Sequence, residues 1–214
     1  MKHLYLFSGL GADCRVFQNM DFGGFDVTHI DWITPKTNES ITDYALRVSA
    51  QITTPHPVLV GLSFGGLIAT EVAKYIDYEQ LILLASVKIR SEIPFYYRLA
   101  GHFRLHRLIP TALMKQPNWL SAWLFGIESQ SDKAILAAVL LDTDPVFLRW
   151  AIDQLVRWEN VTPPSRMTHI HGSADRILPI LFVHNAVAVV GGGHFMTLNK
   201  ADELSRLLRQ VTRT

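Results

Sequence analysis

The chain has 214 residues, with 20 basic and 19 acidic side chains and a formal net charge of +1. Its hydrophobic content of 49% allows one large core, but no apolar run reaches the roughly 18 residues of a membrane-spanning helix, so stable membrane insertion is not expected. No basic stripe is interleaved with aromatic residues, which argues against nucleic acid as a partner, and the single cysteine, Cys14, excludes an internal disulfide and fits a cytoplasmic location.

Strands and helices alternate in the first part of the chain. The segments expected to be strands are 3–7, 26–32, 57–60 and 81–85, and the alternating pattern of 26–32 indicates a sheet edge. A helix with apolar residues from Ile41 to Ile52 follows the second strand, with Thr37 or Asn38 as its cap, and another runs from the third strand to about Tyr75. Right-handed crossovers between such strands predict a parallel sheet with helices on both faces.

The alternation stops after residue 86 and resumes at about residue 160. The segment 87–159 shows helical patterns only, and Asp144 before Pro145 predicts a helix start. Two further strands, 167–171 and 186–190, bring the total to six. We therefore predict one structural domain, an α/β core made of 1–86 and 160–214 with a mostly parallel six-stranded sheet, and an all-helical cap, 87–159, inserted after the fourth strand.

A G-x-S-x-G motif, Gly61-Leu62-Ser63-Phe64-Gly65, lies where the third strand turns into a helix. Such a turn forces its central residue into strained geometry, and the flanking glycines let the chain pass close to itself. The motif alone is weak, because a glycine-rich turn without chemistry has the same sequence.

Cofactor motifs are missing from the chain. The loop Ser8-Gly9-Leu10-Gly11 follows the first strand, but a dinucleotide-binding loop would need a glycine where Cys14 stands, and no Walker sequence is present. His169 and His171 alternate on one strand and point to the same face, yet no third ligand has suitable spacing. We expect neither a cofactor nor a metal.

A serine becomes a useful nucleophile only beside a base, normally a histidine that a carboxylate orients. Loops that follow parallel strands meet at one edge of the sheet. Ser63 follows the third strand, Asp175 the fifth and His194 the sixth, in the chain order associated with this type of turn. Taken alone, Asp175 could instead cap a turn and His194 could be an ordinary loop histidine.

Together these segments resemble the α/β-hydrolase superfamily over nearly the whole chain. The matching segments are Phe7-Ser8-Gly9-Leu10-Gly11, Gly61-Leu62-Ser63-Phe64-Gly65-Gly66, His171-Gly172-Ser173-Ala174-Asp175-Arg176 with Pro179, and Gly192-Gly193-His194-Phe195. The resemblance implies that Ser63 is the nucleophile, His194 the general base and Asp175 its orienting acid, and that the insertion is a cap. It also implies an oxyanion hole made by the backbone N–H groups of Phe64 and Leu10.

Two departures from the family pattern concern the start of the chain. The chain begins at the family's third strand, and the family's His-Gly after that strand is Ser8-Gly9 here. The second departure affects only the oxyanion loop.

Several other groups have simpler interpretations. Asp142, Asp144 and Asp153 are expected to be helix caps or solvated, and Cys14 a small buried residue. The basic cluster of the insertion is expected to lie on a solvated helix face, and it comprises Arg98, His102, Arg104, His106 and Arg107. The aromatic residues of the insertion are expected to form mostly its own core, and they are Phe95, Tyr96, Tyr97, Phe103, Trp119, Trp123, Phe125, Phe147, Trp150 and Trp158.

The resulting hypothesis is a serine hydrolase that cleaves a small ester, thioester or related acyl bond through an acyl-enzyme. The abundance of aromatic residues in the insertion favours an apolar or aromatic small-molecule substrate, although the sequence identifies neither the pocket residues nor the oligomeric state. A carbon-carbon bond hydrolase or lyase with the same triad remains an alternative, as does a non-catalytic small-molecule binding protein on the same fold.

Overall fold

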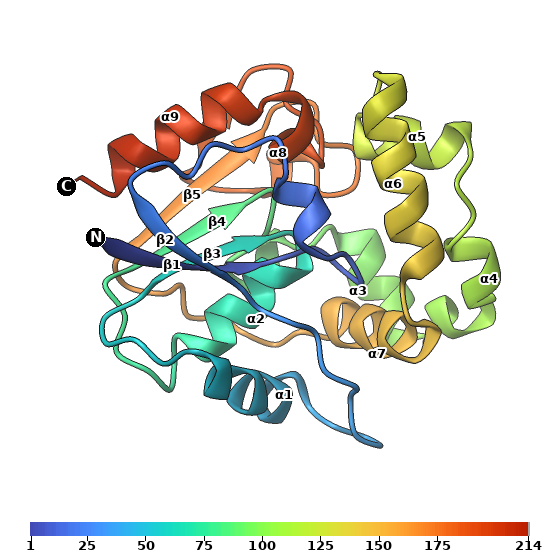
Figure 1. The fold of residues 1–214 in the computed structure, drawn as a ribbon. Coiled ribbons are helices and arrows are strands. Elements are labelled where there is room, and N and C mark those ends of the chain that lie inside the picture. Colours follow the sequence, from blue (N-terminus) through green and yellow to red (C-terminus); the bar gives the residue numbers. More distant parts are fainter. Residues whose placement is uncertain (214) are drawn as a thin grey trace.

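The computed structural model describes residues 1–213, and within them six strands form one sheet in which every neighbouring pair is parallel (Figure 1). The strands are β1 (Lys2–Phe7), β2 (Phe25–His29), β3 (Val58–Leu62), β4 (Gln80–Leu84), β5 (Met167–Gly172) and β6 (Val187–Val189). Their order is β2-β1-β3-β4-β5-β6, so β2 lies at an edge. The predicted parallel sheet is confirmed.

The direction in which the chain winds reverses between β1 and β3. From β1 the chain moves outward to β2, whereas from β3 it proceeds the other way through β4, β5 and β6. Phe7 pairs with Gly61, and Leu62 pairs with Leu84, so the carboxyl ends of the three central strands are level. Open parallel sheets hold their sites at such a reversal, outside the carboxyl ends of the strands.

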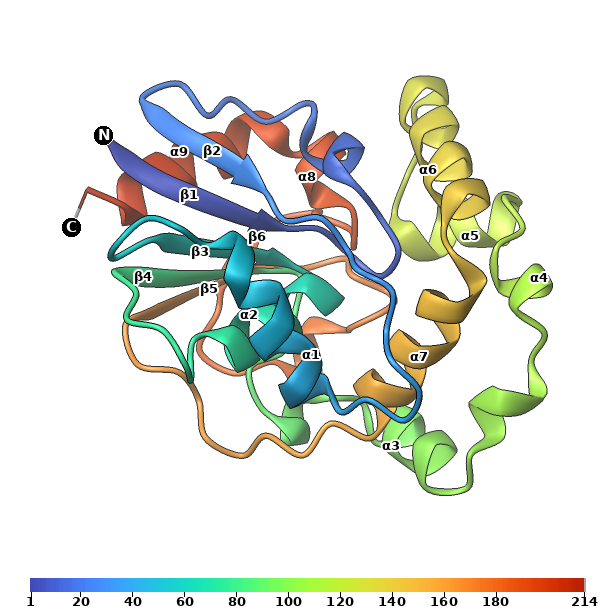
Figure 2. The same cartoon turned by 60° about the horizontal axis from the view of Figure 1, so that its bottom comes forward.

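Helices cover both faces of the sheet (Figures 1 and 2). One face carries α1 (Ile41–Val48) and α2 (Phe64–Val72), and the other carries the 3-10 helix η1 (Cys14–Phe17) with α8 (Met196–Asn199) and α9 (Ala201–Val211). Two hydrophobic clusters follow from this arrangement, one on each face of the sheet. All five residues of β3 are buried, as expected for a central strand covered on both sides.

Between β4 and β5 the described chain is helical, and its helices lie beyond the carboxyl edge of the sheet (Figures 1 and 2). The α-helices are α3 (Phe95–His102), α4 (Thr111–Met114), α5 (Trp119–Phe125), α6 (Gln130–Asp142) and α7 (Pro145–Val156). The remaining 3-10 helices among residues 1–213 are η2 (Ser49–Gln51), η3 (Arg90–Glu92), η4 (Leu105–Leu108) and η5 (Ile180–Phe182). We call the segment from α3 to α7 the helical insertion. As predicted, Asp144 caps α7, because its carboxylate accepts the Phe147 N–H at 2.7 Å.

Two local predictions in the first part of the chain are wrong. Helix α1 is capped by Ser40, whose hydroxyl accepts the Asp43 N–H at 3.1 Å, and not by Thr37 or Asn38. Asn38 has φ 56, a left-handed turn conformation that does not suit the extended backbone of an N-cap. Cys14 is exposed rather than buried, because η1 turns Val16 and Phe17 inward instead.

The insertion also differs from expectation in what it buries. Phe95, Phe103 and Trp119 are among several aromatic residues that are exposed, so they do not form a core of the insertion. His106 is not solvated but buried, and its Nε2 lies 2.9 Å from Asp153 Oδ1. The sequence periodicity of these short helices shows which residues share a face, but not which face packs against the rest of the protein.

Candidate active site

Ser63 lies in a strained turn between β3 and α2. Its backbone has φ 51 and ψ −123, a conformation that is costly for a residue with a side chain. The turn is so tight that a Cβ atom on Gly61 would lie 2.5 Å from Gly66 Cα, closer than side-chain carbons come to backbone. The Ser63 N–H donates to the Leu84 carbonyl at 2.9 Å, which anchors the turn to β4. The G-x-S-x-G sequence is therefore required by the backbone geometry here.

His194 and Asp175 complete a hydrogen-bonded chain that starts at Ser63. His194 Nε2 lies 2.7 Å from Ser63 Oγ, and His194 Nδ1 lies 2.8 Å from Asp175 Oδ2. A neutral imidazole satisfies both contacts, with Nδ1–H donating to the carboxylate and Nε2 accepting the serine proton. All three residues are buried. The structure thus brings together the three residues that the sequence singles out, although they come from three separate loops.

Asp175 is held as a carboxylate in a buried position. Its Oδ1 accepts the N–H groups of Ile177 and Leu178 at 2.9 and 2.8 Å. Burial raises the pKa of Asp175, but His194, the Leu178 N–H and His171 together outweigh burial and hold this pKa below its usual range. An ionised Asp175 fixes the orientation and tautomer of the neighbouring imidazole.

The helical insertion packs directly against the loop that carries His194. The Phe125 ring, at the end of α5, meets the His194 ring edge to face at 5.7 Å, and the Phe125 carbonyl accepts the Phe195 N–H at 3.1 Å. A Cβ atom on Gly126 would lie 2.8 Å from Gly193 Cα, so the backbones of these two segments are in direct contact. A shift of α5 would therefore displace the loop that carries His194.

The two predicted oxyanion donors come from segments next to Ser63. Phe64 follows it at the first position of α2, where a helix leaves its N–H groups without internal partners. Leu10 lies in the loop after β1, and a Cβ atom on the preceding residue, Gly9, would be 3.8 Å from Ser63 Cβ. Within residues 1–213 neither N–H donates to another group.

A buried serine that the sequence analysis overlooked supports the turn from below. Ser86, which follows β4, donates its hydroxyl proton to the Ser63 carbonyl at 2.7 Å. His169 Nε2–H in turn donates to the Ser86 carbonyl at 3.0 Å. The available signal was a polar residue at the carboxyl end of an apolar strand, beside the strand of Ser63.

The same network reaches Asp175 through a second histidine. His171 Nδ1 lies 3.4 Å from His169 Nε2, and His171 Nε2–H donates to the Leu178 carbonyl at 2.7 Å while lying 3.5 Å from Asp175 Oδ2. The two histidines share a face of β5, as their alternation predicts, and they connect the loops of Ser63 and Asp175. Among the residues that the structure describes, no group of three or more His, Cys, Asp or Glu side chains is placed to hold a metal ion.

We predict that His169 makes the folded protein sensitive to mild acid. Burial, the nearby His171 and the charge of Lys88 lower the pKa of His169 to about 3. An unfolded histidine has a pKa of about 6.5, so between these values the unfolded state binds more protons and the free energy of unfolding falls as the pH falls. One such group contributes at most about 1.4 kcal/mol per pH unit.

His169→Gln, whose amide can replace the donor to Ser86, should lessen the loss of stability between about pH 6.5 and 5, a range that begins at the histidine pKa. Urea unfolding at each pH measures it, with the exposed His102→Gln as the matched control. Equal pH slopes for His169→Gln and the wild type would contradict this assignment.

The acidic residues of the insertion serve structural contacts. Asp153 accepts hydrogen bonds from His106, Arg107 and Arg157, and Asp142 pairs with Arg15 at 2.7 Å. A groove of about 1270 Å³ lies between the loop 35–42 and α7, and no triad residue lines it. None of these groups contacts Ser63, Asp175 or His194 directly.

Comparisons with known proteins identify a matching family model and solved structures with a similar fold. The model of the alpha/beta hydrolase family matches residues 4–207. A search of curated proteins gave no match. Among solved structures, an esterase from Exiguobacterium antarcticum has a TM-score of 0.73 at 16% identity, covering 100% of this chain and 92% of that one. A lipase-esterase related protein from Clostridium acetobutylicum has a TM-score of 0.73 at 14% identity, with 98% and 94% covered.

A bromoperoxidase from Bacillus anthracis is also similar, with a TM-score of 0.69 at 16% identity over 100% of this chain and 92% of that one. The identities are low and the three proteins are named for different activities, so these likenesses concern the fold alone.

Proposed function

The chain belongs to the alpha/beta hydrolase family, and from that premise we propose that it is a serine hydrolase that cleaves a small ester, thioester or related acyl bond. The observation that carries the proposal is the continuous chain of short hydrogen bonds from Ser63 Oγ through His194 to Asp175. A serine beside an oriented neutral imidazole is the arrangement that acyl transfer needs.

In the proposed first step, Ser63 Oγ attacks the substrate carbonyl carbon while its proton moves to His194 Nε2. The carbonyl π electrons move to oxygen, and Asp175 stabilises the imidazolium that forms. His194 then returns the proton to the leaving alkoxide or thiolate as the tetrahedral intermediate collapses to an acyl-enzyme. A water molecule, deprotonated by His194 in the same way, releases the acid and restores Ser63.

The developing oxyanion would be received by the N–H groups of Phe64 and Leu10. Neither N–H donates to another group in the described part of the chain, and both belong to segments next to Ser63. Removing one such donor from a comparable site costs about 2.7 to 4 kcal/mol of transition-state stabilisation. We further propose that the helical insertion acts as the cap, because Phe125 contacts the His194 ring.

The proposal is tested with p-nitrophenyl esters of increasing acyl chain length. We expect hydrolysis with a burst of p-nitrophenol equal to the enzyme concentration, since an acyl-enzyme forms before water resolves it. Because the insertion is rich in apolar residues, esters with longer acyl chains should be hydrolysed faster than the acetyl ester. Absence of turnover on every ester would contradict the proposal and favour a binding protein or carbon-carbon bond chemistry on the same fold.

A further inference from the structure

The helical insertion exposes an unusual number of large hydrophobic side chains. More than half of the exposed large hydrophobic residues in the described part of the chain lie between Glu92 and Glu128. We call them the apolar face, and they are Phe95, Tyr96, Leu99, Phe103, Leu105, Leu108, Ile109, Leu113, Trp119, Leu120 and Trp123. Large amounts of exposed apolar surface mark interaction sites.

These residues form stripes on single sides of their helices. Phe95 and Leu99 on α3 and Phe103, its C-cap residue, follow one another at intervals of four, and Trp119 and Trp123 do the same on α5. A helix of a globular protein normally turns such a stripe toward the core. Here the stripes are turned outward, so each helix presents its apolar side to the surroundings.

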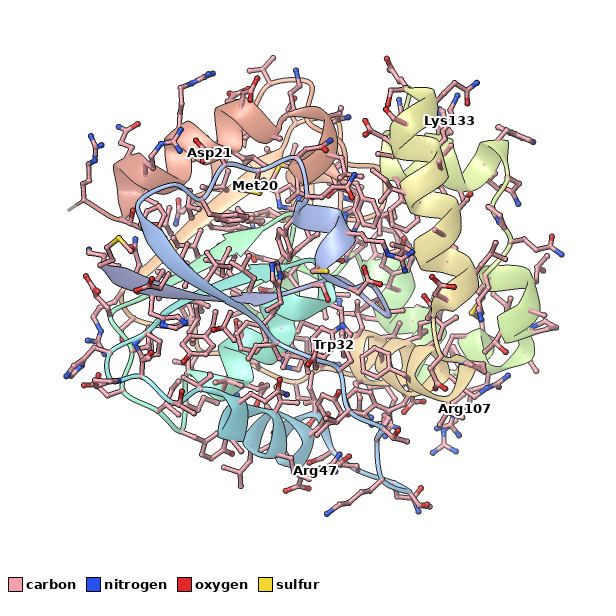
Figure 3. The ribbon with its side chains drawn as sticks, in the orientation of Figure 1. Met20, Asp21, Trp32, Arg47, Arg107 and Lys133 are labelled. Atoms are coloured by element: carbon pink, nitrogen blue, oxygen red, sulfur yellow. The ribbon has the colours of Figure 1, made fainter. Side chains whose placement is uncertain are left out.

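Charge is segregated in the same segment. No acidic residue occurs between Glu92 and Glu128, whereas the whole chain has nearly equal numbers of acidic and basic residues. The basic residues of the segment are Arg98, Arg104, Arg107 and Lys115. Arg107 extends from the outer side of the insertion (Figure 3). The segment therefore carries cations and no carboxylate of its own, although Arg107 pairs with Asp153 of α7 at 2.8 Å.

The apolar face reaches the candidate active site. Arg176, the residue after Asp175, lies over the Trp123 ring at 4.6 Å and donates to the Trp123 carbonyl at 2.6 Å. Phe95 and Tyr96 both contact the ring of Phe182, at 6.4 and 6.1 Å between ring centres. A molecule held on this face would thus lie next to the loop that carries the triad acid.

We propose that the apolar face docks on the surface of an anionic lipid membrane. Exposed Trp, Phe and Leu beside Arg and Lys are the composition that binds at the boundary of headgroups and acyl chains, where tryptophan is enriched and basic side chains meet anionic lipids. A second copy of the chain is a poorer occupant, because it would bring two sets of cations together. Docking would be peripheral, since no described helix is long and apolar enough to cross a bilayer.

Docking has a consequence for the substrate that rests on the proposed hydrolase function. An apolar acyl compound dissolved in the bilayer would reach Ser63 from the side of the membrane, without crossing water. Docking itself requires no catalysis, so the two proposals can fail separately.

Vesicle co-sedimentation tests the docking. Vesicles of phosphatidylcholine alone are compared with vesicles containing about 30% phosphatidylglycerol, at about 0.1 M salt where charges still act over about 10 Å. We expect the wild-type chain and Ser63→Ala to bind the anionic vesicles at least about tenfold more strongly than the neutral ones, and to lose much of this preference in high salt.

The decisive variant removes two apolar side chains that solvent already reaches. Leu108 and Trp119 are 78% and 79% exposed, so Leu108→Ser with Trp119→Ser should leave the fold intact and weaken vesicle binding about tenfold. The matched control is Val161→Ser with Val190→Ser, at residues that are 75% and 77% exposed outside the insertion. The control should bind as the wild type does.

Arg104→Glu tests the role of charge, and its control is Arg213→Glu, two residues after the end of α9. Helix α9 lies on the other side of the molecule from α5 and α6 (Figure 1). Arg104→Glu should lower binding to anionic vesicles only, and the control should not.

Three results would overturn the docking: no binding to either vesicle, equal loss in the variant and its control, or a dimer in sedimentation velocity that Leu108→Ser with Trp119→Ser abolishes. Vesicle binding without ester turnover would leave the docking intact and contradict the hydrolase. Turnover without vesicle binding would do the reverse.

Discussion

Replacing Ser63 with alanine is expected to lower kcat for ester hydrolysis by about a million-fold, the loss seen when the serine of a comparable triad is removed. Ser63 Oγ is the atom that lies 2.7 Å from His194 Nε2, and an alanine side chain in its place would offer no nucleophile. The oxyanion donors and the substrate pocket would remain, so KM should change little. Steady-state kinetics with a p-nitrophenyl ester would measure both constants.

Stability provides the control for this variant. Ser63 holds its strained backbone through its own N–H and carbonyl, which contact Leu84 and Ser86 and are unchanged by the substitution. The free energy of unfolding of Ser63→Ala, measured with urea, should therefore agree with that of the wild type within about 1 kcal/mol, the value of one lost hydrogen bond. Retention of more than a thousandth of the wild-type kcat in a folded variant would rule out Ser63 as the nucleophile.

Gly65→Ala is expected to be the most damaging substitution for the fold. A Cβ atom at Gly65 would lie 2.2 Å from the Ser8 carbonyl oxygen and 2.3 Å from that of Phe7. Both neighbours are backbone atoms at the end of β1, so no side chain can move aside. We expect a loss of about 3 kcal/mol or more in the free energy of unfolding, the upper range for inserting a methyl group into a packed site. Urea unfolding followed by circular dichroism measures it.

Gly9→Ala is the matched control, because it lies in the loop that Gly65 packs against and its Cβ atom would approach nothing closer than 3.8 Å. It should unfold within about 1 kcal/mol of the wild type, as expected where there is room for the added methyl group. Should Gly65→Ala fail to accumulate as a folded protein while Gly9→Ala does, the expectation holds. A Gly65→Ala protein as stable as the wild type would show that α2 does not pack on the end of β1 as described.

The sheet and the triad could be predicted because local signals agree with the fold. The buried run before Ser63 and the glycines around it indicate a strand and a tight turn without any knowledge of the rest of the chain. Asp175 and His194 follow later strands, and parallel strands bring their following loops to one edge. The parallel topology of the sheet therefore explains why three residues that are distant in the sequence lie together.

The support beneath the site could not be read from the sequence in the same way. Ser86 donates to the Ser63 carbonyl and His169 donates to the Ser86 carbonyl, so both roles depend on which groups face each other after the strands pair. The alternation of His169 and His171 predicts a shared face, but their chemistry there is set by burial. Two alternating histidines in a sequence are equally compatible with a metal site and with a pair of hydrogen-bonded side chains.

In the insertion, the sequence pattern identifies apolar residues but does not show whether they are buried. Residues Phe95, Phe103 and Trp119 have the composition of a core but are exposed in the described structure. Helical periodicity shows that apolar residues share a side of a helix, but not what that side meets. The error in assigning them to a core of the insertion is what reveals the apolar face.

The central claim is that Ser63 is an activated nucleophile, and a fluorophosphonate probe tests it most directly. After labelling, digestion and peptide mapping by mass spectrometry locate the adduct. The account predicts a phosphonyl group on Ser63 of the folded wild type, and none on Ser63→Ala or on the wild type unfolded in urea, since only the folded triad activates the hydroxyl. No adduct on the folded wild type, or an adduct on a different residue, would contradict it.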